Sequence, residues 1–222
     1  MTTVGFIGSG KIGSTVARLS VAAGYHVVMS NSRGPETLGA LVDELGPLAR
    51  AALGEQAAAA GDLVVVTIPL RAYASVPAAP LAGKLVLDTT NYYPPRDGHI
   101  AELDSGALTS SELVQRHLTG AHLVKAFNNI FYRHLQALSR PAGAADRSFL
   151  PIAGDDGDAK ARASAFLDAI GWGTVDTGNL AESWRQEPGT PVYGSPYGPF
   201  SEPLGRPADE AVIRAAIAQA TR

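Results

Sequence analysis

Short runs of β-branched and other apolar residues alternate with Ala- and Leu-rich stretches along the whole chain. Several runs, such as "LVVVTI" at 63–68, are continuously apolar, which is typical of strands covered by helices on both faces. The stretches between them have the length and apolar spacing of helices. This alternation predicts a Rossmann-like α/β fold: a doubly wound, mostly parallel sheet with helices on both faces and a small C-terminal extension.

The pattern also places the individual elements. Strands are expected at 4–8, 26–30, 48–52 (the weakest), 63–68, 85–89, 122–127, 148–154 and 173–178. Helices are expected at 10–20, 35–45, 55–60, 72–79, 109–118, 131–138, 157–170 and 208–220. Gly24 stands where the residue after a helix C-cap favours glycine, and Pro35 stands at a helix N1 position. The acidic stretch at 154–160 lacks the spacing of a calcium loop and predicts a helix N-cap region.

The segment 186–207, "QEPGTPVYGSPYGPFSEPLGRP", is rich in proline and glycine and predicts a long irregular loop before the last helix. Its role stays open between a solvated connector and a lid or dimer-swapping arm. The last helix presents Val212, Ile213, Ala216 and Ile217 on one face. That face either docks on its own domain or forms a dimer seam.

The composition argues against several classes of protein. The net charge is −3, which argues against a nucleic-acid binder, and the absence of cysteine excludes disulfides and thiolate chemistry. The N-terminus lacks the pattern of a signal peptide, and the apolar runs are too short to span a bilayer. We therefore expect a cytoplasmic protein with no membrane or nucleic-acid partner.

The sequence "GFIGSGKIGSTVARL" contains G-x-G-x-x-G at Gly8, Gly10 and Gly13. The motif follows a predicted strand and opens a predicted helix, which is the context that a dinucleotide site requires. Gly8 would make the tight turn, Gly10 would admit the pyrophosphate, and Gly13 would let the helix pack closely on the sheet. The alternative is a glycine-rich turn in an unrelated α/β protein.

The end of the second predicted strand indicates which dinucleotide would bind. NAD-binding proteins carry an acidic residue there for the ribose 2′-hydroxyl, but residues 30–32 contain none. Arg33 follows, a forked cation suited to a phosphate, with Asn31 and Ser32 beside it. This arrangement favours NADPH over NADH, unless Arg33 is only a solvated turn residue.

Five segments together give the chain a family resemblance over residues 3–193. They are "GFIGSGKIGSTVARLSVAAGYHVVMSNSR", "VVVTIPL", "LVLDTTN", "LVKAFNNI" and "DTGNLAESWRQEPGTPVYG". Together they resemble the NADPH-dependent coenzyme F420 reductases, which exchange hydride between NADPH and a 5-deazaflavin. The resemblance implies an oxidoreductase with NADP as cofactor and coenzyme F420 as co-substrate.

The resemblance also implies which residues bind the cofactor. The phosphates would contact Ser9, Gly10, Lys11 and Ile12 beside Gly8 and Gly13, and the 2′-phosphate would contact Asn31, Ser32 and Arg33. The nicotinamide half would lie along the loop Ile68, Pro69 and Leu70, with Tyr73 behind that loop, and would be closed by Asn91, Ala126, Phe127 and Asn128. Independently, Pro69, Asn91 and Asn128 each follow a predicted strand, at the sheet edge where open α/β sheets bind ligands.

The remaining chemistry is left open. Hydride transfer needs orientation more than a proton shuttle, and no catalytic residue stands out except His134, the one histidine expected near the cleft. The histidines show no metal-ligand spacing, so no metal is expected. The predicted division is an NADP-binding domain at 1–180, with its C-terminal strands, and a loop with terminal helix at 181–222 that forms a lid or dimer element.

Only scattered cations, Arg71, Arg133, His134 and Arg185, would serve the anionic tail of coenzyme F420. Two alternatives therefore remain: an NADPH-dependent reductase of another small molecule (a flavin, a quinone-like compound or an imine), or a non-catalytic NADPH-binding module. The resemblance favours a homodimer. The sequence does not specify the hydride acceptor, the direction of hydride flow or the oligomeric state.

Overall fold

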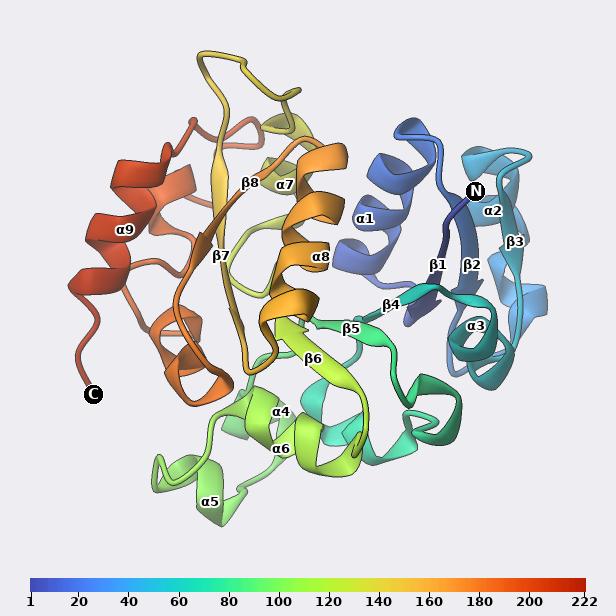
Figure 1. Ribbon diagram of the computed structural model, residues 1–222, viewed down its shortest axis with the longest axis horizontal. Helices are drawn as coiled ribbons and strands as arrows, with labels where there is room; N and C mark the ends of the chain where they lie inside the picture. The colour runs from blue at the N-terminus through green and yellow to red at the C-terminus, as the bar shows by residue number, and fades with distance from the viewer.

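The computed structural model describes all 222 residues and contains one eight-stranded sheet (Figure 1). The strand order is β3-β2-β1-β4-β5-β6-β7-β8, and every neighbouring pair is parallel except β6 and β7. The first six strands have the order of a dinucleotide-binding sheet, which confirms the predicted Rossmann-like fold. The strands are β1 (Thr3–Ile7), β2 (His26–Ser30), β3 (Ala49–Ala51), β4 (Leu63–Val66), β5 (Leu85–Asp88), β6 (His122–Lys125), β7 (Phe149–Gly154) and β8 (Gly173–Asp176).

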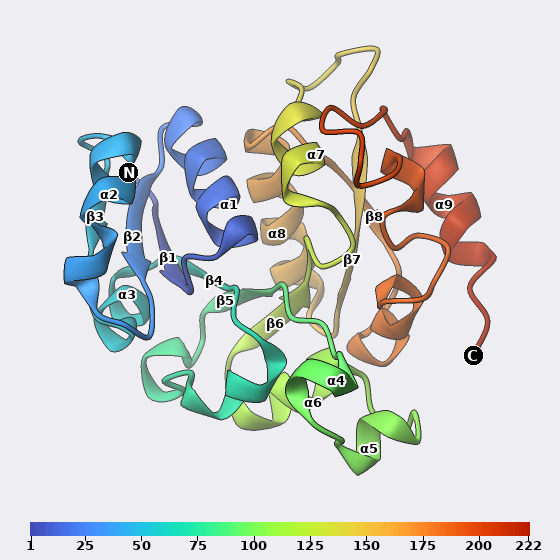
Figure 2. The ribbon, with the colours of Figure 1, turned by 180° about the vertical axis from the view of Figure 1, so that it is seen from behind.

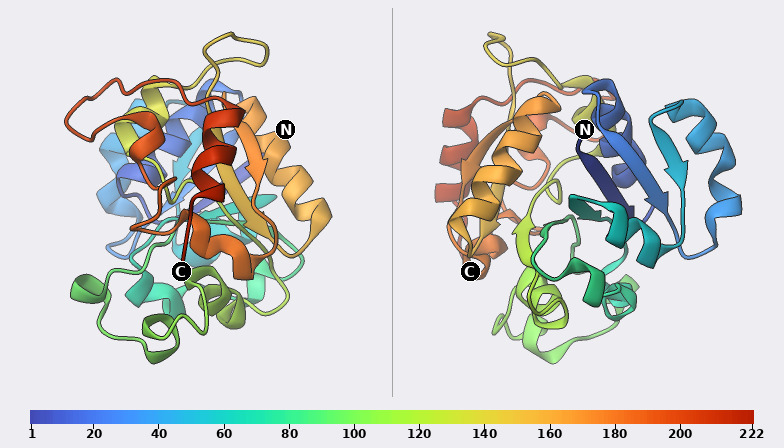
Figure 3. Two further views of the ribbon diagram at one scale, coloured as in Figure 1. Left: turned by 90° about the vertical axis from the view of Figure 1, so that its left-hand side faces the viewer. Right: turned by 45° about the vertical axis from the view of Figure 1, so that its right-hand side comes forward.

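Helices and short 3₁₀ turns connect these strands. The α-helices are α1 (Lys11–Ala22), α2 (Gly39–Leu45), α3 (Gly54–Ala60), α4 (Pro94–Asp97), α5 (Ala101–Asp104), α6 (Ser110–His117), α7 (Tyr132–Ala137), α8 (Gly157–Ala169) and α9 (Glu210–Ala218). The 3₁₀ helices are η1 (Pro35–Leu38), η2 (Leu70–Ser75), η3 (Ala79–Leu81), η4 (Leu180–Gln186) and η5 (Ser195–Tyr197). Helix α7 lies beside α1 (Figure 2), and β7 and β8 lie between α8 and α9 (Figure 3). No helix combines the length and apolarity that crossing a membrane would require.

Strand β4 shows why its sequence is continuously apolar. Leu63 and Val65 belong to the larger hydrophobic core, whereas Val64 and Val66 belong to a second core on the opposite face. Successive side chains of a strand point to opposite faces, so a strand that is buried twice needs apolar residues at every position. Every position of β4 is therefore apolar because both faces of the sheet are covered there, rather than one.

Local signals locate several helix ends correctly. Gly24 follows the C-cap of α1 with φ +84°, and Pro35 opens η1 directly after Gly34. Asp156 caps α8 by accepting a hydrogen bond from Ala159 N at 2.7 Å. This hydrogen bond confirms that the acidic stretch caps a helix, and it is the chief cause that lowers the pKa of the Asp156 carboxyl.

One predicted helix needs correction, and two short helices were not predicted. The helix expected at 72–79 is replaced by the 3₁₀ helices η2 and η3, separated by a short break. Pro77 and Pro80 lack the backbone N–H that a continuous α-helix would need there. The short helices α4 and α5 were missed, because four-residue helices carry almost no periodic signal.

The proline-rich segment 186–207 is not a solvated connector. Val192 and Tyr197 are fully buried, and the Tyr197 ring packs edge-on against Trp172 at 6.1 Å between centroids. The Tyr197 hydroxyl donates to Phe149 O at 2.7 Å, which ties the segment to β7. Burial raises the pKa of the Tyr197 phenol, so this hydroxyl stays a donor.

Helix α9 docks on its own chain. Its Ile213 is fully buried in the larger core, with Ala216 and Ile217 partly buried against it. Val212, predicted on the same apolar face, is instead 44% exposed. The internal docking of α9 therefore uses three of the four residues that the pattern singled out.

Replacing Tyr197 by phenylalanine is expected to lower the free energy of unfolding by about 1–2 kcal/mol, because Phe149 O loses its buried donor. Tyr25→Phe is a matched control, since the Tyr25 ring packs on Phe166 but its hydroxyl makes no hydrogen bond within the protein. Urea denaturation measures both. Equal midpoints for the two variants would contradict a docked segment 186–207.

Candidate functional site

A cleft of about 680 Å³ opens at the carboxyl ends of β1, β2 and β4. The predicted cofactor residues that line it come from the glycine turn, the end of β2 and the loop after β4. The full lining is Ile7, Gly8, Ser9, Gly10, Ser30, Asn31, Ser32, Arg33, Gly54, Glu55, Thr67, Ile68, Pro69, Ala72, Ser75 and Pro77. The edge of the sheet that fold rules favour for ligands is thus hollow and polar.

The three motif glycines differ in what surrounds the position of a side chain. Gly8 has φ +109°, and a Cβ there would stand 2.2 Å from Thr67 O. A Cβ on Gly13 would stand 2.5 Å from Thr67 Cγ2 and 2.7 Å from Gly8 O, so Gly13 lets α1 pack against the turn. Gly10 faces open space, with nothing within 4 Å of a Cβ. The fold itself therefore does not require glycine at position 10, and the space beside it is open to a ligand.

The turn after β2 holds an unpaired cation. The Asn31 amide is used within the protein, since Nδ2 donates to Thr37 Oγ1 at 2.9 Å and to Ser9 Oγ at 3.3 Å. Arg33 N donates to Asn31 Oδ1 at 2.9 Å, which shapes the turn. The Arg33 guanidinium and the Ser32 hydroxyl are exposed and make no hydrogen bond or ion pair within the protein. Asn31 therefore positions the turn, and Ser32 and Arg33 are the groups left for a ligand.

The loop after β4 contributes fewer residues than predicted. Ile68 and Pro69 line the cleft, but Leu70 is fully buried in the second core. Tyr73 packs edge-on against the His117 ring at 5.8 Å between centroids and does not line the cleft. Leu70 and Tyr73 thus support the loop from behind, since the 3₁₀ turn points them inward.

Several residues that line the cleft were not predicted from the sequence. They are Gly54, Glu55, Thr67, Ala72, Ser75 and Pro77. Most of them come from the start of α3 and from η2, which the sheet order brings beside the glycine turn. Thr67 lay inside the strand expected at 63–68, which ends at Val66 in the structure. The others have no motif, and only the fold brings them together.

Asn91 and Asn128 lie after β5 and β6 and hydrogen-bond each other. Asn91 Nδ2 donates to Asn128 O at 2.8 Å, and Asn128 Nδ2 donates to Asn91 Oδ1 at 3.0 Å. Gln186 completes the group. Its side-chain amide donates to Asn128 Oδ1 at 3.0 Å, and its main-chain oxygen accepts from Asn128 Nδ2 at 2.7 Å. The asparagine pair is therefore rigid, and its side-chain amides are largely satisfied within the protein.

The turn that carries Asn128 has an unusual backbone. Phe127 has φ +61° and is the one residue other than glycine with a positive φ. Both Ala126 and Phe127 are fully buried in the larger core. Their side chains therefore anchor the turn, and only their backbone can face a ligand.

The first turn of α1 connects the glycine turn to an aromatic wall, formed by Tyr132, Phe131 and Phe200. Lys11 is exposed, with Nζ 5.1 Å from the centroid of the Tyr132 ring, and Ile12 packs on the larger core. The Phe131 ring meets Tyr132 edge-on at 4.7 Å and stacks on Phe200 at 5.1 Å, with 26° between planes. The wall thus runs from the proposed phosphate site to the C-terminal segment.

Two tyrosines meet where the loop after β5 contacts the C-terminal segment. The hydroxyls of Tyr93 and Tyr193 are hydrogen-bonded, and the Arg96 guanidinium lies 4.7 Å from the Tyr93 ring centroid. Burial, with the bond from Tyr93, raises the pKa of the Tyr193 phenol well above its usual range. Tyr193 also lines a hollow of about 380 Å³ with Phe200 and Arg206. Tyr93 and Tyr193 are 100 positions apart, so no sequence pattern could pair them.

His134 does not lie in the cleft, which corrects its prediction as a catalytic candidate. It is fully buried, and Nε2 hydrogen-bonds Glu202 O at 2.6 Å. Its ring packs edge-on against Phe131 at 5.3 Å, and Gly205 lies against its other side. The segment 200–205 covers this histidine, so it has a packing role.

Three of the cations considered for the anionic tail of coenzyme F420 make contacts within the protein. Arg185 pairs with Glu182 at 2.7 Å and stacks on Trp184 at 4.5 Å. Arg71 Nη1 donates to Arg96 O at 2.9 Å. Arg133 Nε donates to the Tyr132 hydroxyl at 3.1 Å, which lowers the Tyr132 pKa. Arg133 therefore lies beside the aromatic wall, whereas Arg185 is held by Glu182 and Trp184.

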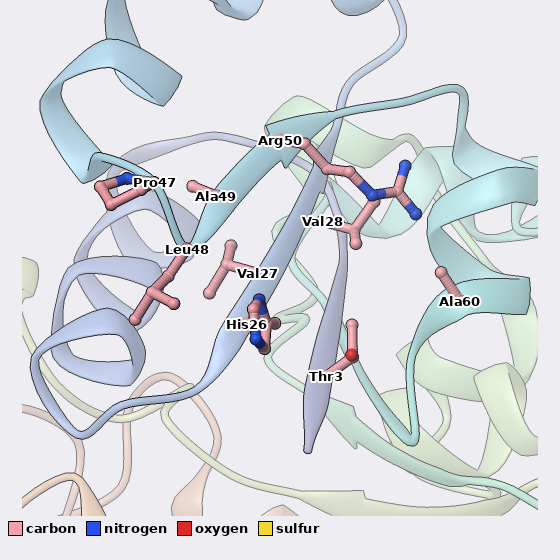
Figure 4. Close-up of a pocket in the computed structure, with 9 residues that line it drawn as sticks. All are labelled: Thr3, His26, Val27, Val28, Pro47, Leu48, Ala49, Arg50 and Ala60. Atoms are coloured by element: carbon pink, nitrogen blue, oxygen red, sulfur yellow. The ribbon is translucent and has the colours of Figure 1, made fainter. Parts of the chain in front are cut away.

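A second hollow of about 360 Å³ lies at the opposite ends of β1 and β2 (Figure 4). Thr3 and His26 begin these strands, and Arg50 of β3 reaches across the hollow toward α3. None of the predicted cofactor residues lines it. The residues that the sequence singled out therefore gather at one end of the sheet and not the other.

Comparison with known proteins identifies the family. Residues 3–92 match the model of the family described as NADP oxidoreductase, coenzyme F420-dependent. A crystal structure of a hypothetical protein from Sinorhizobium meliloti is 30% identical, with a TM-score of 0.75 over 86% of this chain and 93% of that one. A putative F420-dependent NADP-reductase from Arthrobacter is 23% identical, with a TM-score of 0.68 over 82% of this chain and 87% of that one.

The chain belongs to this family. It is therefore a member of a family of NAD(P)-dependent oxidoreductases. More distant structures share the fold alone, among them an imine reductase from Aspergillus terreus at 19% identity and a TM-score of 0.58, which covers 82% of this chain and 56% of that one. The comparison with curated proteins found no match.

Proposed function

We propose that the cleft binds NADP(H) and that the protein transfers hydride between NADPH and coenzyme F420. The unpaired Arg33 guanidinium at the end of β2 is the observation that carries the choice of NADP over NAD. A ribose 2′-phosphate would satisfy it, together with the Ser32 hydroxyl. The one carboxylate of the cleft, Glu55, comes from α3 and not from the end of β2, where NAD-binding proteins place theirs.

The residues present fit the cofactor. The pyrophosphate would lie over Gly10, where a Cβ would meet nothing of the protein, against the free N–H groups at the start of α1. Lys11 adds a positive charge there. The nicotinamide half would follow the sheet edge from Ile68 toward the Asn91–Asn128 pair, because β1, β4, β5 and β6 are consecutive in the sheet. NADP(H) supplies the hydride from its nicotinamide C4.

The choice of coenzyme F420 rests on the family and on the aromatic wall. Tyr132, Phe131 and Phe200 form one aromatic surface, in which Phe131 stacks on Phe200 and meets Tyr132 edge-on, and a planar acceptor such as a 5-deazaflavin would pack against it. Lys11 and Arg133 lie on the Tyr132 ring and would attract the anionic tail of the coenzyme. Hydride transfer between two stacked rings depends on orientation, which the rigid asparagine pair would provide.

Mixing the protein with NADPH and oxidised coenzyme F420 is expected to consume the NADPH absorbance, and reduced coenzyme F420 with NADP is expected to restore it. NADH should support much slower turnover at the same concentration, because it lacks the 2′-phosphate. Absence of turnover in both directions, with NADPH bound, would exclude coenzyme F420 as the acceptor.

A reductase of an uncharged acceptor is the second candidate. This candidate is favoured because the arginines near Tyr193 already make hydrogen bonds or ion pairs within the protein. Arg206 donates to Pro196 O and Ser195 O, each at 3.2 Å, and Arg96 pairs with Asp97 at 2.8 Å. A screen of flavins, quinones and cyclic imines with NADPH tests this candidate, and turnover of one of them without turnover of coenzyme F420 would decide for it.

A further inference from the structure

Lys125, the last residue of β6, is a fully buried cation. Its Nζ donates to Thr90 O at 3.0 Å, Ser110 Oγ at 2.8 Å and Ser111 Oγ at 3.0 Å. An ammonium group has three donors and no acceptor, so these bonds satisfy it completely. A buried charge is tolerated only with such partners.

Two carboxylates complete the cluster through the serines. Ser111 Oγ lies 2.6 Å from Asp88 Oδ2, and Ser110 Oγ lies 2.5 Å from Glu187 Oε1. Because Lys125 cannot accept, each serine must accept from it and donate to its carboxylate. The Lys125 Nζ is itself 3.8 Å from both carboxylates. The direction of every hydrogen bond in the cluster is thus determined.

The cluster holds the asparagine pair from both sides. On one side, Asp88 Oδ1 accepts from Thr90 N at 3.0 Å while Lys125 binds Thr90 O, so both backbone groups before Asn91 are held. On the other side, Glu187 holds the chain directly after Gln186, whose amide closes on Asn128. Segments from three distant parts of the chain thereby meet at one ammonium group.

The hydrogen bonds of the Lys125 cluster contribute more to the placement of the asparagine pair than to the stability of the fold. A buried ion cluster is often no more stabilising than apolar residues of the same shape. Its specific contribution here is the set of directed bonds that places Asn91 and Asn128 relative to each other.

We propose that Lys125 is a positioning residue for hydride transfer: through Thr90 and Glu187 it holds the Asn91–Asn128 pair, and so orients the nicotinamide ring without touching it. This inference rests on the proposed function, which places the nicotinamide at this edge of the sheet. A misplacement of about 1 Å can lower the rate of an oriented reaction about a hundredfold.

The test compares Lys125→Met with Lys84→Met. Lys84 is a matched control at the amino end of β5, where its Nζ also makes three hydrogen bonds, to Ala58 O, Ala59 O and Gly61 O, each at 2.8 Å. Three quantities are measured: the affinity for 2′,5′-ADP, which lacks nicotinamide; the fluorescence emission of bound NADPH, which reports the nicotinamide surroundings; and kcat and KM for turnover.

For Lys125→Met we expect an unchanged affinity for 2′,5′-ADP, a shifted NADPH emission and a kcat lowered roughly 10- to 100-fold with little change in KM for NADPH. Lys84→Met should change none of these. Wild-type emission and kcat in Lys125→Met, or equal changes in Lys84→Met, would overturn the inference.

If Lys125→Met does not fold, Ser110→Ala removes one acceptor of Lys125 and the hydroxyl bond to Glu187, while Ser110 N still donates to Glu187 Oε1 at 2.9 Å. The same emission shift is then expected, at smaller size. An unshifted emission in Ser110→Ala then overturns the inference. If the wild type binds NADPH but does not turn over coenzyme F420, the proposed acceptor fails and the emission still decides the role of Lys125. A wild type that binds no NADPH refutes both.

Discussion

Replacing Gly8 by alanine is expected to destabilise the protein by about 3 kcal/mol or more and to abolish NADPH binding. Gly8 has φ +109°, a region that residues with a Cβ rarely adopt, and the new Cβ would stand 2.2 Å from Thr67 O. The clash is with backbone of the loop after β4, so no side chain can rotate away. Relief requires moving β1 or that loop, and both line the cleft.

Gly10→Ala separates the stability effect from the binding effect. Gly10 has φ −70° and ψ −171°, which alanine adopts readily, and its Cβ would meet nothing within 4 Å. Its free energy of unfolding should equal or slightly exceed that of the wild type, while NADPH affinity falls, because the Cβ occupies the space proposed for the pyrophosphate. Urea denaturation and calorimetric titration measure the two quantities. Undiminished NADPH affinity in Gly10→Ala would place the phosphates elsewhere.

Replacing Arg33 by alanine is expected to lower NADPH affinity roughly ten- to a hundredfold, because a charge-assisted contact of about 1.5–3 kcal/mol is lost. NADH affinity should change little, since NADH offers no 2′-phosphate to this side chain. The Arg33 guanidinium makes no internal hydrogen bond, so the fold should be unaffected. Titration of both cofactors, with the denaturation midpoint as a check on folding, measures the effect.

Arg50→Ala is the control for charge. Arg50 is exposed and makes no ion pair, but it lines the hollow at the opposite ends of the strands (Figure 4). Its loss changes the net charge equally and should leave both cofactor affinities unchanged. Equal losses of NADPH and NADH affinity in Arg33→Ala, or a loss of NADPH affinity in Arg50→Ala, would contradict a specific contact with the 2′-phosphate.

The strands were well predicted because their signals are local. In β4 every residue is apolar since both faces are covered, and β2 was located to the residue, at 26–30. Gly24 and Pro35 act through their own backbone, and the structure confirms the geometry expected at each. Gly8 and Gly13 were located by their motif spacing, although the atoms that exclude a side chain at both positions include those of Thr67, far along the chain. Gly24 and Pro35 are readable from sequence because their physical constraint lies within a few residues, and Gly8 and Gly13 because they belong to a recurring motif.

The sequence was less informative where a side chain finds its partner far along the chain. Leu70 was assigned to the nicotinamide half through the family resemblance, but the 3₁₀ turn η2 directs it inward. His134 was expected near the cleft, yet residues 200–205 cover it. In both cases the deciding contact involves an element whose path the local pattern does not specify.

By itself, the sequence therefore determined the sheet and the glycine turn, because short-range spacing expresses them directly, and the missing carboxylate after β2 drew attention to Arg33. That the Arg33 guanidinium has no partner within the protein is seen only in the structure. Only the tertiary structure decided that Asn31 serves the turn, that segment 186–207 packs on the core, and that Lys125 unites Thr90, Ser110 and Glu187. Ser110 and Glu187 are 77 positions apart, and Tyr93 and Tyr193 are 100 apart. A contact between such residues exists only after the sheet has brought the carboxyl ends of its strands together, and no local pattern contains that information.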